Sequence, residues 1–294
     1  MSLPNFIAIG AQRCGTTWLT ANLRTHPQVF IPPARKEVHF FDQHYERGIG
    51  WYESYFPDNS IKSSHRAIGE ITPRYIFDSS VPSRIADHLP SVRLLAILRN
   101  PVDRAYSHYG LRVRDQGIQT DFRSFIEMNI ENNDDVFERG KYSQQLRRYL
   151  EYFEEDQIHI VIFERFVNNP EQVRSEVADF LGISPHQFSE PEEKQNASYI
   201  PRFPRLRASV RRIADFLRWY GGDWIVEQAK AAGIPHMFGN AGSLPPMEPD
   251  DRRYLADHYE QEIRELESLL SVDLGQWWSV DPERPGSNRS DVES

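Results

Sequence analysis

Residues 10–17, GAQRCGTT, follow the apolar run FIAI and lead into WLTANL. A glycine-containing turn between a strand and a helix directs several backbone N–H groups toward one point, and the helix N-terminus adds about half a positive charge there. The stretch therefore predicts an anion site, although ordinary strand-to-helix turns share this spacing. Arg13 can add a permanently charged donor fork. The other predicted binding residues of the loop are Cys14, Gly15, Thr16, Thr17 and Trp18.

The elements that would position this loop can be read from the apolar pattern. Residues 6–11 predict a buried strand and residues 16–26 the helix after it. Further strands are predicted at 29–32, 67–72, 92–99 and 158–166, and further helices at 101–115, 142–155 and 170–183. Alternating strands and helices favour an α/β fold with a P-loop-like, doubly wound, mostly parallel sheet flanked by helices.

The length and composition of the chain predict its domain organisation. The chain has 294 residues, 39% of them hydrophobic, which can fill one large core. We expect a single domain over residues 1–280, with a helical C-terminal cap or lid at about 200–250. The polar residues 281–294 are expected to be a disordered tail.

Composition limits the function classes. A net charge of −9 argues against general nucleic-acid binding. No run of about 18 apolar residues predicts a membrane span, and the N-terminal residues lack the pattern of a secretory signal. Cys14 is the only cysteine, which excludes an intrachain disulfide and suits a reducing compartment, so cytoplasm is the expected location. The spacing of histidine and cysteine predicts no metal site.

Two motifs in order resemble a known family. GAQRCGTTWL resembles the 5′-phosphosulfate loop of sulfotransferases that use 3′-phosphoadenosine 5′-phosphosulfate (PAPS), and ILRNPVDRAYSHY (97–109) resembles their 3′-phosphate-binding strand and helix. The likeness is greatest to the heparan sulfate 3-O-sulfotransferase branch and its bacterial relatives. It extends over about residues 5–185, with further counterparts in KEVHFFD (36–42), GIGWYESYFP (48–57) and EITPRYIF (70–77).

The resemblance implies roles for individual residues in PAPS binding. Arg13 stands where the family has a lysine and is assigned to the 5′-phosphosulfate; a guanidinium group can stabilise charge there but does not donate a proton near neutral pH. Arg99 and Ser107 are assigned to the 3′-phosphate. KQNASYIPR (194–202) is similar to the loop that covers the cofactor, and Arg202 and Arg205, from an arginine cluster at 202–218, are expected to reach the phosphates.

The acceptor hydroxyl needs a base, and a carboxylate can take its proton in the transition state. Glu37 matches the catalytic glutamate of the family. His39 and Asp42 match positions that help to hold acceptor and base, although a histidine beside two phenylalanines is often only a hydrogen-bonded core group. Lys36 is a weaker candidate for contact with the acceptor or the sulfate, because it could equally pair with Glu37.

One departure bears on the acceptor. The heparan sulfate branch has lysine where this chain has Ile71, so a cation suited to an anionic sugar chain is missing. We therefore expect a small or carbohydrate-like hydroxyl acceptor. Two other functions stay open at this point: a P-loop kinase-like phosphotransferase, for which the lysine at position 16 is lacking, and a non-catalytic nucleotide-binding protein. The oligomeric state is not indicated.

Overall fold

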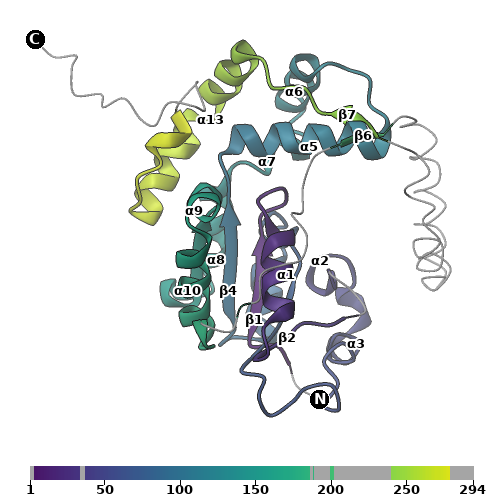
Figure 1. The fold of residues 1–294 in the computed structure, drawn as a ribbon, viewed down its shortest axis with the longest axis vertical. Coiled ribbons are helices and arrows are strands. Elements are labelled where there is room, and N and C mark those ends of the chain that lie inside the picture. The colour runs from purple at the N-terminus through teal and green to yellow at the C-terminus, as the bar shows by residue number, and fades with distance from the viewer. Residues whose placement is uncertain (1–2, 34–36, 186–187, 189–198, 202–239, 279–294) are drawn as a thin grey trace, which may run out of the picture. The chain divides into compact units, whose positions relative to one another are not determined.

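A computed structural model describes residues 3–33, 37–185, 188, 199–201 and 240–278 (Figure 1). Contacts between Cα atoms divide the chain into two compact units. The first comprises Met1–Arg104, Lys141–Gln195 and Glu260–Trp277, and the second comprises Ala105–Gly140, Asn196–Tyr259 and Trp278–Ser294. The expected single domain over 1–280 stays a prediction.

The first unit is built on a parallel sheet. Its strands lie in the order β2-β3-β1-β4-β5, and every neighbouring pair is parallel. Strands β2 and β3 therefore lie on one side of β1, with β3 next to it, and strands β4 and β5 lie on the other side. In such a sheet, ligands bind at the carboxyl ends of the strands, where the strand order reverses, and here that place lies between β1 and β4. The strands are β1 (Phe6–Gly10), β2 (Val29–Phe30), β3 (Ala67–Ile71), β4 (Arg93–Leu98) and β5 (Ile158–Ile162).

Helices connect and flank these strands (Figure 1). The residues of β1 and β4 are almost all fully buried, because helices cover both faces of a doubly wound sheet. This confirms the predicted fold class. The helices of the first unit are α1 (Thr16–Thr25), α2 (Phe40–Gln43), α3 (Ile49–Glu53), α4 (Val81–His88), α8 (Tyr142–Leu150), α9 (Phe163–Asn168) and α10 (Pro170–Leu181).

The second unit is mostly helical among the residues that the structure describes. It contains most of α5 (Pro101–Gln116), together with α6 (Phe122–Glu131), α7 (Asp135–Glu138) and the first half of α13 (Pro249–Leu270). Strands β6 (Tyr199–Pro201) and β7 (Asn240–Ser243) pair antiparallel. Most of the expected cap at 200–250 and the whole expected tail at 281–294 lie outside the described residues.

One strand prediction was wrong at its end. The apolar run 158–166 was expected to be a single strand, but β5 ends at Ile162 and α9 begins at Phe163. Phe163 and Phe166 are three residues apart, a spacing that puts them on one face of a helix. Apolar content alone could not distinguish the two, because both halves of the run are rich in apolar residues.

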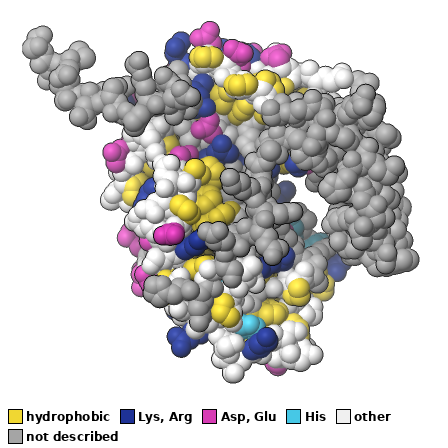
Figure 2. All heavy atoms as spheres, viewed as in Figure 1, with side chains coloured by type: hydrophobic (Ala, Val, Ile, Leu, Met, Phe, Trp, Pro, Cys, Tyr) yellow, Lys and Arg dark blue, Asp and Glu magenta, His cyan; other side chains and the backbone are white. Residues whose placement is uncertain are grey.

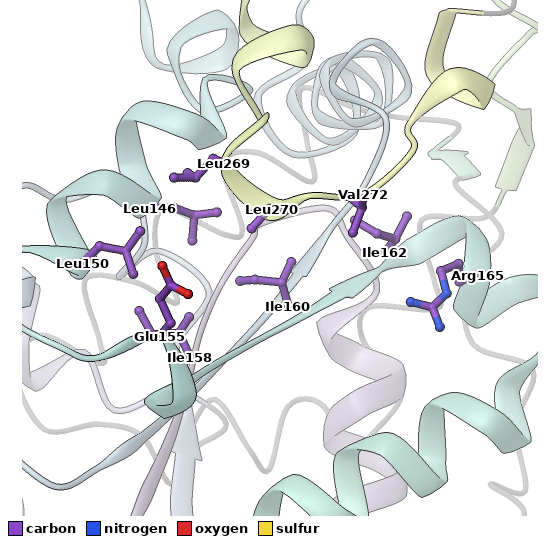
Figure 3. A pocket seen from close by; sticks show the side chains of 10 residues that line it. All are labelled: Leu146, Leu150, Glu155, Ile158, Ile160, Ile162, Arg165, Leu269, Leu270 and Val272. Carbon is purple, nitrogen blue, oxygen red and sulfur yellow. The ribbon is translucent and has the colours of Figure 1, made fainter. Parts of the chain in front are cut away.

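A pocket of about 250 Å³ lies between β5, α8 and the C-terminal end of α13 (Figure 3). Its walls are mainly aliphatic, with Glu155 and Arg165 as the charged lining residues, and it includes no predicted site residue. No helix in the described part of the chain is long and apolar enough to cross a membrane.

Candidate active site

The predicted anion loop connects β1 to α1. Gly15 precedes the helix with φ 91° and Arg13 has φ 72°, so both lie in the left-handed region. A Cβ atom at Gly15 would come within 2.9 Å of the Phe163 ring, which adds a steric reason for glycine. The N-terminus of α1 follows Gly15 directly, and the positive end of a helix dipole favours an anion at such a place.

Arg99 comes directly after β4, the neighbour of β1. Its Nη1 donates to the carbonyl oxygen of Arg13 at 3.5 Å, and its guanidinium carbon lies 4.9 Å from the centre of the Phe163 ring. The structure therefore brings Arg99 to the loop that holds Arg13. The guanidinium group of Arg99 can donate hydrogen bonds to an anionic group bound at this loop.

Two phenylalanine side chains of helix α9 pack against the loop and the start of α1. Besides the contact of Phe163 with Gly15 and Arg99, the ring of Phe166 lies 4.0 Å from that of Trp18 between centroids. Both contacts depend on the helical spacing that the strand prediction missed. The side chain of Trp18 is therefore engaged in packing.

Glu164 fixes the turn that follows Arg99. Its Oε1 accepts from the backbone N–H of Asn100 at 2.9 Å, and its Oε2 accepts from Nε1 of Trp277 at 3.0 Å. Burial raises the pKa of Glu164, while these donors oppose the rise. Sequence reasoning did not single out this residue, and a glutamate inside the apolar run 158–166 was the available signal.

Cys14 belongs to the loop but its side chain is fully buried. The sulfur lies 3.6 Å from the hydroxyl oxygen of Tyr142, which donates to the carbonyl oxygen of Arg99 at 3.0 Å. Burial raises the pKa of the Cys14 thiol to about 11, despite that contact and the nearby arginines. The thiol is therefore neutral and contributes to packing, and only the backbone of Cys14 remains for ligand binding.

The predicted base and its two partners do lie together. Nε2 of His39 is 3.1 Å from Glu37 Oε2, and Nδ1 is 3.0 Å from Asp42 Oδ2. The exposed fractions of the side chains fall along this chain, from 31% at Glu37 through 21% at His39 to 0% at Asp42. Arg74 Nε lies 3.4 Å from the buried carboxylate of Asp42. Glu37 is thus the member of the trio that solvent reaches most.

The trio favours a protonated imidazole. A neutral ring can donate through one nitrogen only, whereas both nitrogens of His39 face carboxylates. Burial lowers the pKa of His39, but the hydrogen bonds and charges of Asp42 and Glu37 outweigh this effect and raise the pKa to about 9. His39 therefore favours the positively charged form at neutral pH, and a ring that carries a proton on both nitrogens has no free lone pair.

The segment that carries Glu37 is attached to the end of β3. The backbone N–H of Val38 donates to Glu70 Oε2 at 3.3 Å and to Thr72 Oγ1 at 3.2 Å. The N–H of Thr72 in turn donates to the carbonyl oxygen of Ala8 in β1 at 3.0 Å. The Glu37 segment is therefore attached to the carboxyl end of the sheet, where the anion loop also lies.

Four other predicted site residues are not part of the geometry described so far. Ser107 lies on α5 in the second unit, so its place at the 3′-phosphate stays a prediction. Lys36, Arg202 and Arg205 lie outside the described residues. Within the described ranges, no three side chains of histidine, cysteine, aspartate or glutamate form a group that could hold a metal ion.

Comparisons with known proteins agree with this architecture. Residues 3–200 match the family described as the sulfotransferase domain. The chain is 29% identical over 285 residues to bifunctional heparan sulfate N-deacetylase/N-sulfotransferase 3 of Mus musculus, in an alignment that covers 91% of the chain and 30% of that relative. It is 25% identical over 293 residues to membrane-associated sulfotransferase kil1 of Dictyostelium discoideum, covering 71% and 62% of the two.

A solved structure shares the fold as well. The crystal structure of a sulfotransferase from Alicyclobacillus acidocaldarius has a TM-score of 0.69 and 26% sequence identity, and the match covers 94% of this chain and 99% of that one. The narrower resemblance to the 3-O-sulfotransferase branch stays a prediction. Since the family match includes more than half of the chain, with the loop at residues 10–17 and the segment 97–109 inside it, this chain belongs to the sulfotransferase domain family and is a sulfotransferase.

Proposed function

We propose that this sulfotransferase moves a sulfuryl group from PAPS to a hydroxyl group of a small or carbohydrate-like acceptor, with Glu37 as the general base. One observation supports this assignment most. The hydrogen bonds from Val38 to Glu70 and Thr72, and from Thr72 to Ala8, attach the segment of Glu37 to the strand beside the anion loop.

The residues at the loop fit PAPS. The donor carries phosphate groups at the 5′ and 3′ positions, and the site offers the N-terminus of α1 together with Arg99, whose side chain contacts the backbone of Arg13 in the loop. When bound, PAPS supplies the sulfuryl group and leaves as adenosine 3′,5′-bisphosphate (PAP). Charge grows on the bridging oxygen during transfer, so a fixed guanidinium group at Arg13 would stabilise the transition state.

Glu37 would take the proton that the acceptor hydroxyl loses. The imidazolium of His39 donates to Glu37 and orients its carboxylate, while buried Asp42 fixes the ring from the other side. We therefore assign His39 and Asp42 to positioning the base. The proposal also includes the predicted contacts with acceptor and cofactor of four further residues: Lys36, Ser107, Arg202 and Arg205.

The acceptor class rests on two arguments. Ile71 is fully buried, so this position adds no cation for a sulfated polymer. A relative that acts on heparan sulfate favours a carbohydrate-like acceptor, but the chain spans only about 30% of that relative's length. Its name also includes N-sulfotransferase, so amine acceptors belong in the test.

Location in the cytoplasm is proposed from the cysteine content alone.

Labelled PAPS tests the function directly. Hydroxylated sugars, glycolipids and their amino-sugar analogues are incubated with the protein, and transfer of label is measured. Glu37→Gln keeps the size of the side chain but removes the base, so sulfation should fall roughly 10²–10⁴-fold while affinity for PAP persists.

A matched control is Glu46→Gln, because Glu46 is an exposed carboxylate a few residues further along the same segment. This variant should keep normal turnover. If Glu37→Gln turned over as fast as Glu46→Gln, Glu37 would not be the base. Label on amine acceptors alone would replace the hydroxyl in the proposal by an amine.

A further inference from the structure

Glu70 is a carboxylate buried inside the sheet. It lies in β3 with no exposed surface, although glutamate is among the residues that are least often fully buried. Four groups donate to it. Oε1 accepts from the hydroxyls of Tyr52 at 2.8 Å and Tyr75 at 3.0 Å, and Oε2 accepts from Thr72 Oγ1 at 2.7 Å and from the N–H of Val38 at 3.3 Å.

Two of these contacts reach the segment that carries Glu37. The N–H of Val38 belongs to the peptide bond that directly follows Glu37, so the first contact is made at the base itself. The second passes through Tyr75, whose hydroxyl accepts from the N–H of Phe41 at 3.3 Å while it donates to Glu70. Glu70 therefore holds the backbone on both sides of His39.

The conformation between the two anchors needs this support. His39 has φ 57°, in the left-handed region that non-glycine residues seldom adopt. Such a conformation persists where the surrounding structure imposes it, and sites of this kind often lie at functional positions. The anchors at Val38 and Phe41 fix the turn that directs His39 toward Glu37 and Asp42.

We propose that Glu70 is a positioning residue for the base: through Val38 and Tyr75 it holds the Glu37–His39 turn in the geometry that sulfuryl transfer requires. The proposal rests on the proposed role of Glu37. Glu70 itself touches no substrate. All four of its partners donate, which suits a carboxylate that only accepts. An amide at this position would turn an N–H group toward at least one donor and break that anchor.

Glu70→Gln tests the proposal. A displacement of about 1 Å at a reacting group can lower turnover about 10²-fold, so kcat should fall by about that factor. The affinity for PAP, measured by calorimetry, should stay within about twofold, because the anion loop does not depend on Glu70. The imidazole titration of His39, followed by NMR and assigned with His39→Gln, should move down by about 1 unit or more, since its contact with Glu37 loosens.

Glu262→Gln is the matched control. Glu262 is also a buried glutamate that accepts from a backbone N–H and a hydroxyl, both of Ser143, but it does not contact the Glu37 segment. The Glu262→Gln variant should leave kcat and the His39 titration unchanged. If Glu70→Gln lowered kcat without moving the His39 titration, or left both unchanged, the proposal would be overturned.

A second variant keeps the test decisive if Glu70→Gln does not fold. Tyr75→Phe removes only the hydroxyl that joins Phe41 to Glu70, and we expect a loss in kcat of about tenfold with a downward shift of the His39 titration. Normal values for both would refute the positioning role. If Glu37→Gln itself kept full activity, the base assignment would fail, while the His39 titration of Glu70→Gln would still decide whether Glu70 holds the turn.

Discussion

Two arginines, Arg13 and Arg99, are predicted to bind the donor at the anion loop, and we expect different losses when each side chain is removed. Arg99→Ala should weaken PAP binding roughly 10–100-fold, since a charge-assisted hydrogen bond contributes about 1.5–3 kcal/mol. Arg13→Ala should lower kcat more than it weakens PAP binding, because charge on the bridging oxygen develops only toward the transition state. Calorimetry with PAP and turnover with labelled PAPS measure the two effects.

Arg93→Ala is the control for this pair. Arg93 lies at the opposite end of β4 and donates to the carbonyl oxygen of Leu181, away from the loop. PAP affinity should be normal in this variant. If Arg13→Ala raised the Michaelis constant and left kcat intact, its assignment to the transition state would be wrong.

His39 also predicts a pH dependence of stability. Its pKa is about 9 in the folded protein and about 6.5 when unfolded. Between these values the folded state binds more protons, so this contribution is fully present below pH 6.5 and is lost as pH rises through 9. It amounts to about 3 kcal/mol at most. Unfolding by denaturant at a series of pH values should show this loss, and His39→Gln should lack it; an equal slope in both proteins would contradict the assigned pKa.

At the scale of elements, carboxylates of α13 contact Ser143 in α8. Glu262 accepts from the N–H and the hydroxyl of Ser143, and burial raises the pKa of Glu262 to about 7. The folded state therefore binds an extra proton between pH 4.5 and 7, and this contribution to stability is lost as pH rises through that window. In the Glu262→Gln variant, the decrease in the free energy of unfolding between pH 4.5 and 7 should be smaller by about 3 kcal/mol at most. The effect of His39 above pH 7 should persist in this variant, which separates the two groups.

At the scale of the whole molecule, the cofactor should stabilise the fold. A ligand that binds only the folded state contributes about 2.7 kcal/mol at 100 times its dissociation constant, which corresponds to roughly 5 °C in Tm for a chain of this size. PAP should produce this shift without added metal, and ATP a smaller one. Equal or greater stabilisation by ATP with magnesium would favour a phosphotransferase.

Calorimetry also tests the domain prediction. One cooperative transition over residues 1–280 is expected, whereas two transitions of which PAP shifts only one would show that the two compact units unfold separately.

Acidic and basic side chains are interspersed on the face shown in Figure 2, and the chain has a net charge of −9. Affinity for a highly sulfated polymer is therefore not expected from the described surface on that face.

The sequence by itself determined the fold class and the turn between β1 and α1, for which it also predicted anion binding. The spacing of GAQRCGTT between an apolar run and a helical pattern is a local property, because the turn, its glycine and the helix start all lie within about ten residues. The strand order places Arg99 beside this loop because both follow parallel strands that are neighbours in the sheet. The motif of Glu37, His39 and Asp42 is likewise local, and the side chain of His39 contacts both carboxylates.

Only the tertiary structure decided how these parts are held. Glu70 and Tyr75 contact the Glu37 segment across more than 30 positions of sequence, and Glu164 reaches Trp277 across 113. No periodicity within a segment can indicate such partners, since they depend on which strand ends lie side by side. The change from β5 to α9 was missed for the same reason: Phe163 and Phe166 pack under the loop, and that packing selects a helix where apolar content alone allows a strand.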